Sequence, residues 1–359
     1  MNAIDFAAAL ADWYRLNARE LPWRKTRDAY HIWLSEVMLQ QTQVTTVRPY
    51  YRKFLQLWPT ISDLAAADIS SVMKAWEGLG YYARCRNLHA AANQIVQEHG
   101  GVFPRKIEDV IALRGIGRST AGAILTFAYA QRHPLLDANV KRVLTRLYDE
   151  DGIVTKAAVE RRLWQWSQTL LDGAADPWTH NQAMMELGAT LCAPKKPNCP
   201  RCPVKIECLA HAHGTQRERP QKKKRKPIPH KHIGVGVIRC PDDPRKVLVQ
   251  LRPPEGLLGG LWEFPGGKQE PDETIERTIA RELREELDIE VTVQHHICDV
   301  QHAYSHFKVT LHTYWCRLDS GTPRARVAVE WKWVPIHELT HLAFPKANRA
   351  ILEELIDEA

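Results

Sequence analysis

A short basic segment divides this chain into two halves with different sequence patterns. Residues 217–226 read R-E-R-P-Q-K-K-K-R-K, and prolines follow shortly after. Before this segment apolar residues recur at helical spacing, whereas after it they gather in short β-type runs such as 235–238, 247–251 and 309–314. Two folds are therefore expected, joined by a solvated linker or a phosphate-binding arm. We expect an all-α domain over residues 1–213, the linker over 214–230 and an α+β domain over 231–359.

The composition fits a globular protein with an anionic partner. The chain has 359 residues, of which 44% are hydrophobic and 25% charged, and its formal net charge is +7. It contains no apolar run long enough to span a bilayer and no recognisable signal peptide. We therefore expect a cytoplasmic monomer without a membrane partner, whose cysteines outside any metal site are reduced.

Four of the eight cysteines lie within 17 residues, at Cys192, Cys199, Cys202 and Cys208. Four thiolates on one short loop can close around a single metal centre. Zinc sites usually pair C-x2-C knuckles, and only Cys199 and Cys202 have that spacing. Iron–sulfur clusters are commonly held by four thiolates in one continuous run. The spacing thus favours an iron–sulfur cluster, with zinc or a disulfide pair as the alternatives.

A glycine-containing turn separates two expected helices in the first half. The residues L-R-G-I-G, which end with Gly115 and Gly117, stand between helical segments at 107–113 and 118–131. Two glycines one residue apart allow a tight turn that directs backbone N–H groups outward at a helix N-terminus. Such a turn can bind a DNA phosphate, although a G-x-G between helices often marks a turn alone.

Two carboxylates in the first half stand in contrasting environments. Asp137 directly precedes an expected helix and is placed to cap it, where the helix dipole favours the ionised form. Glu36 is the only acid in an apolar helical stretch, so burial should raise its pKa and keep it protonated. Either residue alone could be structural. Together they form the acid and anion pair that cleaves glycosidic bonds.

These segments resemble the MutY family of adenine DNA glycosylases, within the endonuclease III superfamily. The string S-E-V-M-L-Q-Q-T-Q-V around Glu36 is a close match, and the glycine turn resembles the superfamily's helix-hairpin-helix motif with Arg114 in place of proline. Asp137 follows Gly117 by twenty residues, as the catalytic aspartate does there. The resemblance implies a 4Fe–4S cluster on the four cysteines. It also implies base excision repair of double-stranded DNA, by removal of adenine mispaired with 8-oxoguanine or guanine.

The resemblance assigns roles to the catalytic residues. Glu36 would protonate nitrogen-7 of an extruded adenine, and Asp137 would stabilise the oxocarbenium-like sugar. Asn139 would orient Asp137 or the attacking water. Ser119 stands where lyase members of the superfamily carry a Schiff-base lysine, so water must complete the reaction and a monofunctional glycosylase is expected. Lys141 lies beyond Asp137 on the same helix and is expected to contact phosphate.

Further residues are implied to contact the DNA. Gln41 matches the residue that wedges into the base stack when adenine is extruded. Tyr81 matches the aromatic residue that intercalates beside the damaged base, and its alternative role is helix packing. Gly115 and Gly117 would contact phosphate through their backbone. Four residues align with the family's adenine pocket, namely Leu21, Trp23, Arg24 and Gln182.

The second half contains a Nudix box with one departure. Residues 267–289 fit G-x5-E-x7-R-E-U-x-E-E-x-G-U, where U is aliphatic, except that Asp288 replaces glycine. Glu282, Glu285 and Glu286 share one helix face, which can hold Mg²⁺ because hard cations prefer oxygen ligands. An acidic surface helix is the alternative. We expect Asp288 to end the helix in the left-handed conformation.

The second half of the chain resembles two different proteins of the Nudix fold. Tyr304, Ser305 and His306 resemble the loop with which the MutY C-terminal domain contacts 8-oxoguanine, whereas residues 344–348 resemble MutT, whose corresponding asparagine, here Asn348, reads the oxidised base. The whole chain is therefore expected to combine an all-α helix-hairpin-helix glycosylase domain, closed by an iron–sulfur loop at 192–208, with an α+β Nudix-like domain that reads 8-oxoguanine. A bifunctional enzyme that also hydrolyses 8-oxo-dGTP is the alternative.

Overall fold

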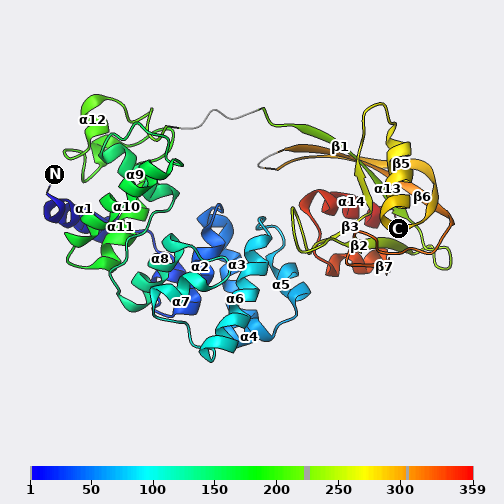
Figure 1. Ribbon diagram of the computed structural model, residues 1–359, viewed down its shortest axis with the longest axis horizontal. Helices are drawn as coiled ribbons and strands as arrows, with labels where there is room; N and C mark the ends of the chain where they lie inside the picture. The colour runs from blue at the N-terminus through cyan, green and yellow to red at the C-terminus, as the bar shows by residue number, and fades with distance from the viewer. Residues whose placement is uncertain (1, 222–226, 305–306, 359) are drawn as a thin grey trace. The chain divides into compact units, whose positions relative to one another are not determined.

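The computed structural model describes residues 2–221, 227–304 and 307–358 (Figure 1). These residues form two compact units. The first unit comprises residues 1–66 and 87–225, and the second comprises residues 67–86 and 226–359. All of the named strands in the described ranges lie in the second unit, as the change in sequence periodicity predicts.

The first unit is built from α-helices and two short 3-10 segments. Its elements are α1 (Ala3–Asn17), η1 (Pro22–Arg24), α2 (Ala29–Leu39), α3 (Val44–Leu57), α4 (Ile61–Ala66), α6 (Ala83–His99, whose first turn belongs to the second unit), α7 (Ile107–Ala112), α8 (Arg118–Tyr129), α9 (Ala138–Leu147), α10 (Ala157–Asp172), α11 (Pro177–Thr190), η2 (Cys199–Arg201) and α12 (Leu209–His213).

Helix α2 runs through the core of the first unit. Its sequence A-Y-H-I-W-L-S-E-V-M-L is apolar on almost every side, which is typical of a helix that is buried all round. Trp33, Leu34 and Met38 are fully buried. Asp28 caps the helix by accepting hydrogen bonds from the backbone N–H groups of the first turn. The helix therefore carries Glu36 into an apolar interior.

The glycine turn and the helix after Asp137 form as the sequence predicts. Helices α7 and α8 flank the turn, within two residues of the predicted limits. Gly115 has φ +78°, and a Cβ added there would lie 2.7 Å from Cβ of Asn87, so only glycine fits. Asp137 is the N-cap of α9, and its carboxylate accepts a hydrogen bond from the Val140 amide.

The described part of the second unit is built from two sheets and several helices. Its elements are α5 (Ile69–Trp76), β1 (His230–Ile238), β2 (Lys246–Leu251), β3 (Trp262–Glu263), β4 (Gly266–Lys268), α13 (Ile275–Leu287), β5 (Glu290–Ala303), β6 (Lys308–Ser320), β7 (Glu330–Pro335), η3 (Ile336–His341) and α14 (Lys346–Asp357). One sheet has the order β4-β1-β6-β5 and the other β3-β2-β7. Strands β1 and β6 are parallel, whereas the other ladders are antiparallel.

Helices α13 and α14 contribute to two separate apolar cores of this unit. Helix α13 approaches β1 closely because β1 carries glycines: a Cβ on Gly234 would lie 2.8 Å from Ile279. Helix α14 packs with Trp315 and Phe344 in the other core. Asp288 ends α13 with φ 60° and ψ 36°, which confirms the predicted left-handed cap. No helix in the described part of the chain is long and apolar enough to cross a bilayer.

Candidate active site

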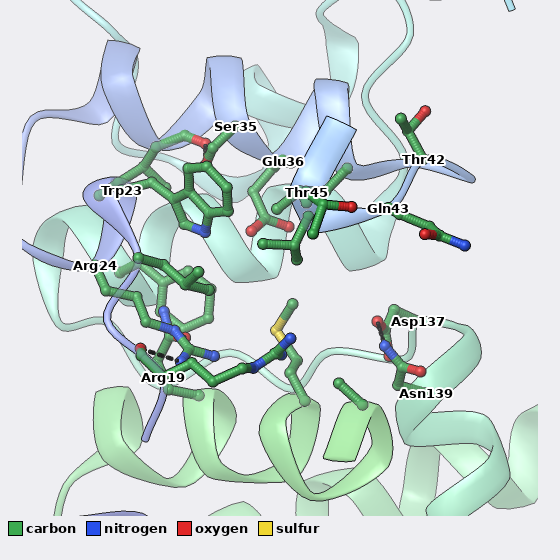
Figure 2. Close-up of a pocket in the computed structure, with 18 of the residues that line it drawn as sticks. Arg19, Trp23, Arg24, Ser35, Glu36, Thr42, Gln43, Thr45, Asp137 and Asn139 are labelled. Atoms are coloured by element: carbon green, nitrogen blue, oxygen red, sulfur yellow. Dashed lines mark hydrogen bonds between the residues drawn. The ribbon is translucent and has the colours of Figure 1, made fainter. Parts of the chain in front are cut away.

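A cavity of about 610 Å³ in the first unit brings the two predicted carboxylates together. Glu36 points into it from α2, and Asp137 lines it from the start of α9 (Figure 2). A smaller neighbouring cavity of about 100 Å³ is also lined by both carboxylates and by Ser119. The two residues lie 101 positions apart in the sequence. Helix α2 packs on α8, and both α8 and α9 pack on α11, which brings the two carboxylates to one cavity.

The environment of Glu36 favours its protonated form. Burial raises the pKa of Glu36 to about 8, and the negative charge of Asp137 acts in the same direction. The positive charge of Arg24 opposes this shift. At neutral pH the carboxyl group therefore holds a proton that it can donate into the cavity.

Within the described chain, Asp137, unlike Glu36, accepts hydrogen bonds from neighbouring N–H groups. Its Oδ1 accepts from the Val140 amide at 2.7 Å, and its Oδ2 accepts from Nδ2 of Asn139 at 3.4 Å. Burial raises the pKa of Asp137, while these donors and the charge of Arg142 favour the anion. These donors favour ionisation of Asp137, whereas for Glu36 only the charge of Arg24 acts in that direction. The arrangement can therefore hold a proton on Glu36 and a negative charge on Asp137.

Asn139 and Arg142 connect Asp137 to the cysteine loop. Nη2 of Arg142 donates to Oδ1 of Asn139 at 2.8 Å, and Nε of Arg142 donates to the Cys192 carbonyl at 2.8 Å. Gly188 allows this approach, because a Cβ there would lie 2.6 Å from Cβ of Asn139. Sequence reasoning did not single out Arg142, although its spacing of three residues from Asn139 was a usable helical signal.

Arg19, Arg24 and Gln182 form another wall of the cavity, and the buried Glu186 connects the two arginines. Glu186 is fully buried, and its carboxylate accepts from Nε and Nη2 of Arg19 at 2.6 and 2.9 Å and from Nη2 of Arg24 at 2.7 Å. Nε of Arg24 in turn donates to Oε1 of Gln182 at 2.8 Å. Figure 2 shows both arginines at the edge of the cavity. Sequence reasoning missed Glu186 and Arg19; the i, i+4 spacing of Gln182 and Glu186 on α11 was the available signal.

The other predicted pocket residues line the same cavity. Leu21 and Trp23 are buried and belong to its wall, next to Arg24. Ser119 faces the smaller cavity, and its hydroxyl accepts a hydrogen bond from the Leu136 amide at 2.9 Å. Lys141 donates to Glu160 at 2.6 Å, so a phosphate at this lysine would have to compete with a carboxylate.

Two residues that were expected to enter the base stack have unusual backbones. Gln41 in the first unit and Tyr81 in the second have φ of 58° and 50°. The left-handed region is uncommon for residues other than glycine, and such strain concentrates at functional positions. Both side chains are exposed, Tyr81 to 42%. Gly117 is exposed as well, with open space where a Cβ would stand.

The four cysteines of the loop converge on one small cavity. Cys192, Cys199, Cys202 and Cys208 are free thiols and line a space of about 30 Å³ together with Arg146. Burial raises the pKa of Cys202 to about 12, so an uncompensated thiolate is unfavourable there. A bound metal would supply the compensating positive charge. No three His, Cys, Asp or Glu side chains in the described ranges close around a single metal ion.

Arg146 ties this loop to α9. The residue is 2% exposed. Its guanidinium donates to the sulfur of Cys192 at 3.2 Å and to the carbonyl groups of residues 192, 193, 194, 216 and 219. A planar guanidinium with five N–H groups suits so many acceptors. Sequence reasoning missed this residue, because all of its acceptors lie at least 46 positions away.

The carboxylates of the Nudix box are engaged with neighbouring side chains. Arg281 contacts Glu282 at 2.9 Å and Glu285 at 3.2 Å, and Gln250 donates to Glu286 at 2.8 Å. Burial raises the pKa of Glu286 to about 7, so this group is partly protonated at neutral pH. Each of these contacts engages one oxygen of its carboxylate, and the Mg²⁺ site stays a prediction.

The residues expected to read 8-oxoguanine are described only in part. Ser305 and His306 lie outside the described residues. Tyr304 stacks on Phe307, with ring centroids 4.9 Å apart. Asn348 is buried in the first turn of α14, where its Oδ1 accepts from the Phe264 amide at 3.2 Å.

Comparison with known proteins associates each half with a known family. Residues 34–169 match the family model of HhH-GPD superfamily base excision DNA repair proteins, and residues 234–354 match the NUDIX domain. The adenine DNA glycosylase of Rattus norvegicus is 36% identical over 96% of this chain and 77% of its own length. That of Homo sapiens is 35% identical over 96% and 73%.

Solved structures resemble the helical half. A thermostable thymine-DNA glycosylase matches with a TM-score of 0.53 and 26% identity, over 59% of this chain and 97% of its own. Endonuclease III in a non-covalent DNA complex matches with a TM-score of 0.50 over 60% and 99%. Its identity of 19% supports a shared fold alone.

Proposed function

Because this chain belongs to the adenine DNA glycosylase family, we propose that it removes adenine mispaired with 8-oxoguanine or guanine in double-stranded DNA. The observation that carries the proposal is the shared cavity of Glu36 and Asp137. A protonated acid and an anion that face one space are what the cleavage of an N-glycosidic bond requires. The reaction belongs to base excision repair, and the protein is a DNA N-glycosylase.

The reaction begins when adenine leaves the base stack and enters the cavity. Glu36 donates its proton to nitrogen-7, so the electron pair of the bond between C1′ and N9 can leave with a neutral base. The sugar then carries positive charge, which the Asp137 carboxylate stabilises. Asn139 fixes the orientation of Asp137 through the hydrogen bond between their side chains.

Water completes the reaction. Its oxygen bonds to C1′ and its proton is released, which leaves free adenine and an abasic sugar. Ser119 offers a hydroxyl in place of the amine that a Schiff base needs, and this hydroxyl is occupied by the Leu136 amide. The enzyme is therefore proposed to be monofunctional and to leave the DNA strand uncut.

The cysteine loop is proposed to hold a 4Fe–4S cluster. Four thiols around one cavity supply the soft ligands that such a cluster takes. The cluster would order the loop, so that Lys195, Lys196, Arg201 and Lys205 can face DNA phosphates.

The second unit is proposed to read the base opposite adenine. Tyr304 and Asn348 are the described residues of this reader, with Asn348 held beside Phe264. Hydrolysis of 8-oxo-dGTP stays the alternative function; Arg281 and Gln250 engage one oxygen of each box carboxylate, and Mg²⁺ would have to compete with these contacts.

A duplex assay tests the proposed function. The protein should release adenine from duplexes that place it opposite 8-oxoguanine or guanine, and it should leave adenine opposite thymine intact. The product strand should remain uncut until alkali is added. Equal release opposite thymine, or strand cleavage without alkali, would contradict the proposal.

We expect Glu186→Gln to impair adenine release by about 10- to 100-fold. An amide leaves the charges of Arg19 and Arg24 without their shared buried counter-ion, which is a costly arrangement. Arg24 then no longer holds Gln182 against the cavity. Single-turnover rates across a range of protein concentrations would show the loss. Glu98→Gln, at an exposed glutamate of the same unit, is the matched control; equal rates for both variants would exclude this role of Glu186.

A further inference from the structure

Residues 67–86 carry Tyr81 and belong to the second compact unit, together with residues 226–359. The segment consists of α5, a glycine-containing loop at 78–80 and the first turn of α6. Tyr81 stands directly after this loop with φ 50°. Contacts that hold this segment therefore set where the Tyr81 side chain is presented.

Glu77, at the end of α5, makes several of these contacts. Its side chain is 8% exposed, and its Oε1 accepts from the Phe344 amide at 3.0 Å. Its Oε2 lies 2.6 Å from Nζ of Lys74 and 3.5 Å from Nη1 of Arg349. Lys74 also donates to the Leu342 carbonyl at 2.9 Å. One carboxylate thus joins α5 to the chain on both sides of Pro345.

The contacted chain is the start of α14, which carries Asn348. Phe344 stands two positions before the helix, and a carboxylate near a helix N-terminus is favoured by the helix dipole. The amide of Phe264 donates to Asn348, and the rings of Phe264 and Phe344 stack with centroids 5.6 Å apart. Glu77 therefore accepts a hydrogen bond from Phe344, and Phe344 packs against Phe264, which is hydrogen-bonded to Asn348.

A second contact holds the other end of the segment. The guanidinium of Arg86 donates to the Gly259 carbonyl, and a Cβ on Gly260 would lie 3.5 Å from both Met73 and Arg86. Residues 73–86 are thus fastened at both ends to the unit that contains Asn348. The Tyr81 loop lies between the two attachments.

We propose that Glu77 is a positioning residue that couples the Tyr81 loop to the start of α14. When a base engages Asn348, the start of α14 shifts or becomes more ordered, and Glu77 transmits this to the loop that presents Tyr81. Recognition of the opposite base thereby controls how Tyr81 enters the stack. This inference rests on the proposed function.

The test compares preference for the opposite base in Glu77→Ala and in Glu290→Ala. Glu290 forms an exposed ion pair with Arg284 in the same unit and serves as the matched control. In Glu77→Ala the ratio of single-turnover rates opposite 8-oxoguanine and guanine should fall about fivefold or more, within the usual range of coupling between sites. In Glu290→Ala the ratio should stay unchanged. An unchanged ratio in folded Glu77→Ala would overturn the proposal.

A double-mutant cycle separates coupling from a general loss of stability. In the unsubstituted background, Tyr81→Ala and Asn348→Ala should have non-additive effects on the rate opposite 8-oxoguanine, because the two positions are coupled. In the Glu77→Ala background the effects of the same two substitutions on this rate should become additive. Non-additivity that survives in Glu77→Ala would contradict the inference. Should Glu77→Ala not fold, Glu77→Gln removes the ion pairs with Lys74 and Arg349 and keeps an acceptor for the Phe344 amide. The rate ratio should then fall by less than in Glu77→Ala, and an unchanged ratio would overturn the proposal.

Hydrogen exchange separates failure of this inference from failure of the proposed function. The Phe344 amide should exchange faster in Glu77→Ala than in Glu290→Ala, because it loses its acceptor. An unchanged exchange rate would refute the contact itself. Failure of the proposed function would appear instead as absent adenine release by the unsubstituted protein on every duplex.

Discussion

Replacing Glu36 with glutamine is expected to lower the single-turnover rate of adenine release by about 10²- to 10⁴-fold, the usual contribution of a general acid. Glutamine has nearly the same volume but no acidic proton to give to the departing base. The measurement is the rate on a duplex with adenine opposite 8-oxoguanine. Glu20→Gln is the matched control, because Glu20 is an exposed glutamate whose carboxylate pairs with Lys25 at the surface.

The same variant should be more stable than the unsubstituted protein at pH 8. Burial raises the pKa of Glu36 in the folded state to about 8, whereas an unfolded glutamate has a pKa of roughly 4.3. The folded state therefore binds the proton more tightly, and its stability declines as the pH rises between these two values. Glutamine does not ionise, so the variant should not lose stability in this way as the pH rises. Thermal unfolding of both proteins across that pH range would show the difference. A variant that is both fully active and no more stable would contradict the assigned role.

Arg146→Lys is expected to release the cysteine loop. Lysine keeps the charge but has one nitrogen, so most of the carbonyl groups now bound by the guanidinium would lose their donor. Hydrogen bonds to a charged group contribute roughly 1.5–3 kcal/mol each, so a loss of about 3 kcal/mol or more in unfolding free energy follows. The purified variant should contain less iron and should melt at a lower temperature.

The control for Arg146 is Arg201→Lys, at an exposed position of the same loop. The control variant should have the same iron content and the same melting temperature as the unsubstituted protein. Iron content, visible absorbance and thermal unfolding are measured on both variants. Full iron content in Arg146→Lys together with an unchanged melting temperature would exclude the proposed role of this buried arginine.

Short-range sequence rules predicted the parts of the site that depend on local structure. Asp137 was predicted as a helix cap because aspartate is strongly preferred at the N-cap position directly before a helix. The left-handed end of α13 at Asp288 followed in the same way. The burial of Glu36 followed from the apolar stretch around it. These predictions needed no knowledge of which elements pack together.

The residues that sequence reasoning missed depend on contacts between distant segments. Arg19 meets Glu186 across 167 positions, and Phe344 meets Glu77 across 267. Nothing near these residues in the sequence indicates their partners.

In the Nudix box the local spacing is informative, but the contacts made by the side chains are not predicted. Its spacing places three glutamates on one helix face, but it does not indicate that Arg281 contacts two of them.

The central claim is that a protonated Glu36 and an ionised Asp137 act on the same nucleotide. The dependence of the single-turnover rate on pH tests this most directly, on a duplex with adenine opposite 8-oxoguanine. The rate should rise with pH as Asp137 ionises, and it should fall above about pH 8 as Glu36 loses its proton. A rate that stays constant or continues to rise through pH 9 would contradict the claim.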